Sequence, residues 1–121
     1  MIREYEMTLI ARSDLPETEI QKLLAKYEKF MTIDGGQILK KDVWGSRRLA
    51  FPINKQFRGF YANYDFVGVP AHLTEMERLM RIDESVLRYM SVKLGECADI
   101  EARRTDLNKP RVQQSDDDNG N

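Results

Sequence analysis

The sequence predicts an α+β fold in which two helices cover one face of a four-stranded antiparallel sheet. Apolar and polar residues alternate along residues 2–10 and 59–67, which is typical of half-buried strands. Two segments, residues 16–31 and 70–81, instead carry apolar residues at helical spacing. With further strands at 37–53 and 85–94, the order becomes strand, helix, strand, strand, helix, strand. This order is typical of the split βαβ, or ferredoxin-like, arrangement.

The first strand and the first helix have the clearest patterns. Along the strand, Tyr5, Met7 and Leu9 share one parity, so we expect them to face the core. Asp14 and Pro16 are a start signal for the helix. Its apolar stripe comprises Ile20, Leu23, Leu24, Tyr27, Phe30 and Met31. Asp34-Gly35-Gly36 then ends it, because glycine readily adopts the left-handed conformation after a helix.

The second strand is predicted at the sheet edge, because Pro52 cannot donate a ladder hydrogen bond and lysines and arginines are frequent there. Residues 54–58 are predicted as its turn, and the next strand follows at 59–67. In that strand Phe60, Ala62, Tyr64 and Phe66 share the parity expected to face the core. Both parities of residues 85–94 are apolar, so the pattern leaves its buried face open. The first and third strands should lie in the centre of the sheet.

The length of 121 residues suits one domain. We expect a ferredoxin-like domain over residues 1–95. Residues 96–121 are predicted to form a polar C-terminal tail, disordered in the free protein, because they bury too little apolar surface to offset their ordering entropy.

Charge is unevenly distributed along the chain, whose net value is −1. The first 95 residues hold 15 basic and 13 acidic side chains, whereas residues 96–121 hold 4 and 7. Residues 40–58 hold six basic residues against Asp42 alone. Such a segment suits contact with phosphate, which is local and screened over about 8–10 Å. It also suits an edge strand that lysines and arginines keep soluble.

Several classes of function are disfavoured by composition. With one cysteine, Cys97, and one histidine, His72, the chain lacks the ligands of a typical zinc site and has no histidine cluster. We therefore expect no metal, no cofactor and no catalytic residues. No apolar run is long enough to span a bilayer, and the first residues lack a secretory pattern. A soluble, cytoplasmic protein without membrane contact is expected.

Residues 44–55 (WGSRRLAFPINK) form the most distinctive segment. They combine a tryptophan, paired arginines and an embedded proline. This segment resembles the signature of the bacterial small-subunit ribosomal protein six family. The resemblance also includes residues 3–6, 59–61 and 81–88, and it covers roughly the first 95 residues.

The resemblance implies a structural role without catalysis or a small-molecule substrate. Family members bind the central domain of small-subunit rRNA as a pair with ribosomal protein eighteen, so both are implied as partners, in the ribosome. Carried onto this sequence, the resemblance implies RNA contacts at Arg3, Tyr5, Lys55, Arg81 and Arg88. Arginine forks match phosphate oxygens, and folded RNA is recognised largely by shape.

The protein partner is assigned to the edge strand. Its predicted contacts are Val43, Trp44, Arg47, Arg48 and Leu49, since tryptophan and arginine are enriched at binding hot spots. The alternative is that Trp44 packs under the hairpin.

Other functions remain open to the same fold. Arg58-Gly59-Phe60 begins like the third strand of an RNA recognition motif, but Ala62 stands where a second outward aromatic is needed. Acylphosphatase-like chemistry would need a glycine-rich anion loop, whereas residues 11–16 read ARSDLP. The remaining alternative is a ferredoxin-like regulatory module that dimerises through its sheet and binds a small metabolite.

Overall fold

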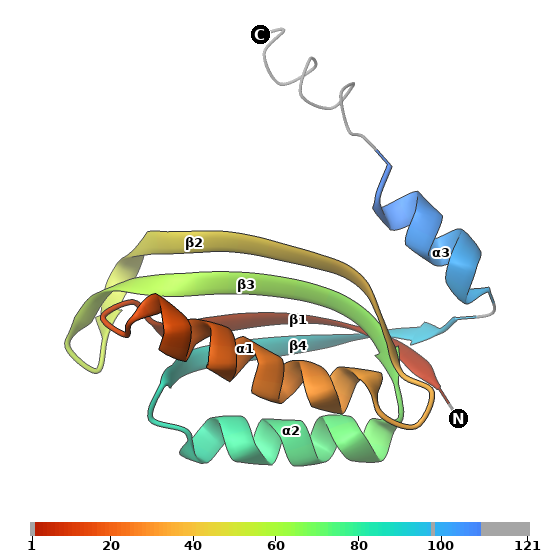
Figure 1. Ribbon diagram of the computed structural model, residues 1–121, viewed down its shortest axis with the longest axis horizontal. Coiled ribbons are helices and arrows are strands. Elements are labelled where there is room, and N and C mark those ends of the chain that lie inside the picture. The colour runs from red at the N-terminus through yellow and green to blue at the C-terminus, as the bar shows by residue number, and fades with distance from the viewer. Residues whose placement is uncertain (1, 98, 110–121) are drawn as a thin grey trace, which may run out of the picture.

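Four strands and three helices make up the chain in this computed structural model, which describes residues 2–97 and 99–109. Their bounds are β1 Arg3–Arg12, α1 Glu17–Thr32, β2 Gln37–Ile53, β3 Gln56–Gly68, α2 Pro70–Ile82, β4 Val86–Glu96 and α3 Ile100–Leu107. The strands form one antiparallel sheet in the order β2-β3-β1-β4 (Figure 1). The predicted ferredoxin-like order is confirmed, with β1 and β3 in the centre.

The core lies between the sheet and the layer formed by α1 and α2 (Figure 1). The predicted parities of β1 and β3 are confirmed, because Met7 pairs with Tyr64 and both are fully buried. Buried residues of the helices are Ile20, Leu23, Leu24, Tyr27 and Met31 from α1, and Met76 and Met80 from α2. The α1 and α2 helices do not cover the opposite face of the sheet.

The structure decides the face of β4 that the sequence left open. Tyr89 packs against the core and accepts a hydrogen bond from Arg81 on α2, and Ser91 bonds to Glu77 on the same helix. Met90 and Val92 therefore lie on the opposite face, 60% and 52% exposed. The α2 helix selects between two parities that are similarly apolar.

The connection between β2 and β3 is shorter than predicted. Only Asn54 and Lys55 form the turn, both with left-handed φ values of 49° and 65°, and Ile53 pairs with Gln56 across it. This is the backbone of a two-residue type I′ turn, which matches the twist of the flanking strands. The expected turn over residues 54–58 is wrong, and residues 56–58 belong to β3.

The segment expected as a polar, disordered tail, residues 96–121, contains a strand end and a helix in its first part. Glu96 ends β4, and α3 follows with Asp99 as its cap, whose side chain accepts from the Ala102 N–H at 3.0 Å. Residues 110–121 lie outside the described part of the chain.

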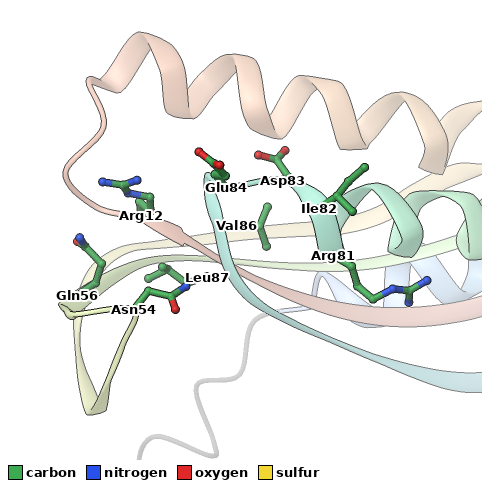
Figure 2. A pocket seen from close by; sticks show the side chains of 9 residues that line it. All are labelled: Arg12, Asn54, Gln56, Arg81, Ile82, Asp83, Glu84, Val86 and Leu87. Atoms are coloured by element: carbon green, nitrogen blue, oxygen red, sulfur yellow. The ribbon is translucent and has the colours of Figure 1, made fainter.

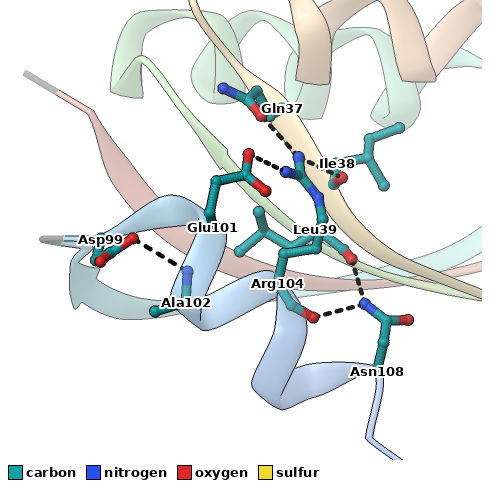
Figure 3. A network of polar contacts seen from close by, with 8 residues as sticks. All are labelled: Gln37, Ile38, Leu39, Asp99, Glu101, Ala102, Arg104 and Asn108. Carbon is teal, nitrogen blue, oxygen red and sulfur yellow. Dashed lines mark hydrogen bonds and ion pairs between the residues drawn. The ribbon is translucent and has the colours of Figure 1, made fainter.

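The α3 helix docks on β2 and lies apart from the layer formed by α1 and α2 (Figure 1). Arg104 donates to the side-chain oxygen of Gln37 at 2.6 Å, and Asn108 donates to the backbone oxygen of Leu39 at 2.9 Å (Figure 3). No residue of α3 is buried, so polar contacts rather than an apolar stripe hold it. Composition alone does not predict the α3 helix, because the residues that it contacts on β2 lie far away in the sequence.

Candidate nucleic-acid interface

Three segments of the chain meet at the end of the sheet where β1 finishes. The end of β1, the β2–β3 turn and the α2–β4 connection surround a polar hollow of about 390 Å³ (Figure 2). Its lining includes Arg12, Asn54, Arg81 and Glu84. A second hollow of about 460 Å³ is lined by Asn54, Arg81 and Arg88, among others. Asn54 lines both hollows and is the neighbour of Lys55. We call Lys55, Arg81 and Arg88 the basic end.

Two acids at this end of the molecule, Asp83 and Asp14, are already engaged, whereas Glu84 is exposed at the hollow. Asp83 accepts from Tyr27 Oη at 2.7 Å, from the Ser85 N–H at 2.9 Å and from Lys26 Nζ at 3.2 Å. Burial acts to raise the pKa of Asp83, but these bonds and the charge of Lys26 hold it below its usual range. The carboxylate is therefore ionised and compensated.

Asp14 is engaged in the same way. It forms a two-pronged ion pair with Arg12, at 2.8 and 3.1 Å. The bond from Arg12 lowers the pKa of Asp14, and Arg12 is thereby occupied. Across residues 2–97 and 99–109, no acid pairs with Lys55, Arg81 or Arg88. Three cations at one end thus remain available to an outside anion.

Two of the predicted RNA contacts lie elsewhere. Arg3 begins β1 and pairs with Gly68, about 30 Å along the strand from the basic end. Tyr5 is 3% exposed, and its ring packs against Phe66 with a centroid distance of 5.6 Å. The prediction that Tyr5 contacts RNA is contradicted by this burial, because its ring faces the helices. The five predicted residues do not form one surface.

The predicted partner residues lie on β2, the edge strand of the sheet. Val43 and Trp44 are each 45% exposed, and Trp44 stacks on Tyr61 with ring centroids 6.0 Å apart. Arg47 and Arg48 are exposed, with no acidic partner in the part of the chain described. Trp44 therefore has one ring face on the sheet and remains accessible at the edge.

Leu49 differs from the other predicted partner residues. It is only 7% exposed, and its side chain lies against Gly59, where a Cβ atom would be 3.3 Å from it. The assignment of Leu49 to a partner surface is wrong, because the residue fills the sheet at the base of the hairpin. Val43, Trp44, Arg47 and Arg48 form the remaining edge surface.

Sequence reasoning missed a buried charged cluster on the face opposite α1 and α2. Glu4 is 5% and Asp65 7% exposed, and Arg103 of α3 donates to both oxygens of Glu4 at 3.0 and 3.1 Å. Within the described residues, Asp65 Oδ1 has no hydrogen-bond partner. Asp65 lies opposite Glu6 in the β1–β3 register, and Glu4 is two residues from Glu6 on β1. Acidic residues this close on two central strands are the signal that could have suggested this cluster.

The cluster predicts a pH-dependent stability. Burial, followed by the hydrogen bond and charge of Glu4, raises the pKa of Asp65 to about 7, and the Arg103 charge opposes this. Glu6 on β1 and Lys40 on β2 also face Asp65 in register. Since the pKa is raised in the fold, the contribution of Asp65 is fully present only below about pH 4 and is lost as pH rises to about 7.

The free energy of unfolding of Asp65→Asn, relative to that of the parent, is accordingly expected to rise between about pH 4.5 and 7. Above that range the difference between the two proteins should stay constant. Urea unfolding at each pH measures the difference. Gln21→Ala is the control, because Gln21 is exposed on α1 and carries no titratable group, so its curve should run parallel to that of the parent. A parallel curve for Asp65→Asn would show that Asp65 titrates normally.

Among the described residues, no three His, Cys, Asp or Glu side chains gather as metal ligands. Nor does any described helix combine the length and apolar character needed to cross a bilayer.

Comparison with known proteins agrees with this geometry. A sequence profile described as Ribosomal protein S6 matches residues 4–93, most of the chain. The chain belongs to the ribosomal protein S6 family. A small ribosomal subunit protein bS6 of Geobacter metallireducens is 42% identical over 94 residues, which cover 78% of this chain and 80% of that relative. The resemblance seen in residues 44–55 is thereby confirmed.

Two further S6 relatives differ in extent. The bS6 of Gloeothece citriformis is 38% identical over 78% of this chain, which spans only about half (53%) of its length. The crystal structure of 30S ribosomal protein S6 from Thermotoga maritima superposes with a TM-score of 0.71 at 24% identity, covering 90% of this chain and all of that one. It supports the fold. S6 proteins are structural ribosomal proteins, so the prediction that the chain is not an enzyme is confirmed.

Proposed function

We propose that the chain binds the central domain of small-subunit rRNA together with ribosomal protein eighteen, in the cytoplasmic ribosome. The observation that carries this proposal is that Arg81 and Arg88 line one hollow with Asn54, the neighbour of Lys55, and that none of these three cations has an acidic partner among the described residues. The three come from a turn, a helix end and a strand, so their spacing is set by the fold. A rigid array of cations suits the shaped backbone of folded RNA.

The edge surface supports the second half of the proposal. Trp44 presents one ring face, and Arg47 beside it lies on an exposed strand edge. Tryptophan and arginine contribute strongly to protein interfaces. Because this edge and the basic end are joined by the β2–β3 hairpin, RNA and a protein could be bound at once. Membership of the S6 family disfavours the metabolite module considered above.

The logarithm of the RNA-binding constant falls linearly with the logarithm of the salt concentration, and each phosphate contact contributes about 0.9 to this slope. We expect Lys55→Ala to make the slope smaller by about 1. The ligand is a transcript of the central domain, and affinity is measured from low to moderate salt. Lys22→Ala is the matched control, because Lys22 is exposed on α1 and paired only with Glu19. It should leave the slope unchanged.

Parent binding that stays level across this salt range would count against phosphate contact. The protein partner is tested by a pull-down from lysate with and without ribonuclease. Direct pairing with ribosomal protein eighteen predicts that this protein survives the treatment while other small-subunit components are lost. Loss of ribosomal protein eighteen together with the RNA would argue against direct pairing.

A further inference from the structure

A third hollow, of about 340 Å³, lies on the face of the sheet that α1 and α2 do not cover. Its floor comes from β1, β2 and β3, and two apolar side chains, Trp44 of β2 and Leu107 of α3, form part of its wall. Its other lining residues are polar, and most of them are acidic. We call it the acidic hollow.

The strand register brings the carboxylates of this hollow together. Asp65 on β3 lies opposite Glu6 on β1 and Lys40 on β2, and Asp42 pairs with Asn63 two positions further along. Residues two positions apart on a strand share one face, so all five point to the same side of the sheet. Three carboxylates therefore face one ammonium group, and Lys40 forms no ion pair with any described residue.

The acidic hollow lacks hydrogen-bond donors. Asp65 is 7% exposed, and within the described part of the chain its Oδ1 has no partner. The amide of Asn63 does not fill this role, since it donates to Thr8 Oγ1 at 2.8 Å. Glu6 and Asp42 are exposed and make no ion pair with residues 2–97 or 99–109. A buried acceptor without a donor is unfavourable, so a cation that donates hydrogen bonds would stabilise the site.

Trp44 specifies the shape of that cation. One face of its ring stacks on Tyr61, with centroids 6.0 Å apart, and the ring is 45% exposed. A cation over the face of a tryptophan is attracted by the charge distribution of the ring. A guanidinium is planar and carries several N–H donors, whereas an ammonium is compact and more strongly hydrated. Phosphate would be repelled by the carboxylates, which separates this hollow from an RNA surface.

We propose that the acidic hollow binds the guanidinium of an arginine side chain of the protein partner, which stacks on Trp44 and donates to Asp65 Oδ1. Glu6 and Asp42 add attraction, and together with Asp65 they outnumber the opposing Lys40. Trp44 belongs to both the hollow and the edge surface, so the arginine can enter while its own chain lies along β2. This inference rests on the proposed function and adds to it the chemistry of the partner residue.

Binding can be measured directly, because Trp44 is the only tryptophan of the chain and its fluorescence reports on the hollow. The full chain is titrated with N-acetyl-arginine methylamide, whose ends carry no charge, and with the matching lysine compound. The arginine probe should change the fluorescence saturably and bind more tightly than the lysine probe. Asp65→Asn is expected to weaken binding of the arginine probe about tenfold, because a charge-assisted hydrogen bond is lost. Glu17→Gln is the control and should bind as the parent does, since Glu17 is an exposed acid on α1.

The affinity should also depend on pH. Asp65, whose pKa is raised to about 7, becomes ionised as the pH rises, and the guanidinium pairs with the ionised form. Binding of the arginine probe should therefore tighten severalfold from about pH 6 to about pH 8, and Asp65→Asn should lose this rise. The charged groups around Asp65 are Glu4 and Glu6 on β1, Lys40 and Asp42 on β2, and Arg103 on α3. Burial raises the pKa of the nearby Cys97 thiol, which keeps it neutral over this range.

The partner is tested in the ribonuclease-treated pull-down. Excess arginine probe should release ribosomal protein eighteen from the parent, and Asp65→Asn should retain less of it. If the probe binds the hollow but neither treatment changes retention, the assignment to the partner is wrong. The inference also fails if the parent does not bind the arginine probe, if Asp65→Asn binds it as tightly, or if the lysine probe binds more tightly. Failure of the proposed function differs, since the parent would then lose ribosomal protein eighteen with the RNA while the probe still binds.

Discussion

Gly36→Ala is expected to lower the free energy of unfolding by about 3 kcal/mol, measured by urea denaturation. A Cβ atom at Gly36 would lie 2.3 Å from the backbone oxygen of Met31 and 3.0 Å from that of Val67. The first oxygen belongs to α1 and the second to β3, so both are held by their own elements. The chain must pass this close to them to enter β2 after α1.

The matched control is Gly68→Ala. There a Cβ atom would lie 3.5 Å from the Phe66 ring, an ordinary contact distance. Its stability should stay within about 0.5 kcal/mol of the parent, or rise slightly because alanine restricts the unfolded chain. Equal effects at the two glycines would mean that the close approach at Gly36 is not maintained in solution.

Phe66→Ala should cost about 3–5 kcal/mol, because it removes a buried ring and leaves a cavity. Phe66 is 2% exposed in the centre of the sheet and packs against Tyr5. The transition midpoint in urea, with an unchanged slope, measures the loss. This is the largest destabilisation expected from one side chain discussed above.

Phe57→Ala is the control on the same strand. Phe57 is 66% exposed, so its removal should change stability by less than about 0.5 kcal/mol. A large destabilisation by Phe57→Ala would show instead that the Phe57 ring packs against the protein.

The elements that were predicted correctly have one strong periodicity each. Along β3, the alternation of Phe60, Ala62, Tyr64 and Phe66 with polar residues is sufficient to define the buried face. In β4 both parities are apolar, and the contacts of Tyr89 and Ser91 with α2 decide between them. Periodicity is informative only where one face is clearly less polar than the other.

The candidate site was predicted only in part. The residue types at Lys55, Arg81 and Arg88 could be named from the resemblance, but not the hollow that Arg81 and Arg88 share or the pairing of Asp83 with Lys26 and Tyr27. Tyr5 and Leu49 were misplaced because a motif does not reveal which face of a strand its residues occupy.

The sequence by itself determined the order of the elements, the buried faces of β1, α1 and β3, and the chemistry of residues 44–55. These follow from local backbone geometry, which sets a period of two for strands and 3.6 for helices. The tertiary structure alone decided the docking of α3, through bonds such as Arg104 to Gln37 and Arg103 to Glu4. It also decided which cations share one end of the molecule. Such contacts join residues far apart in the chain, and no local pattern encodes the partner that each side chain meets.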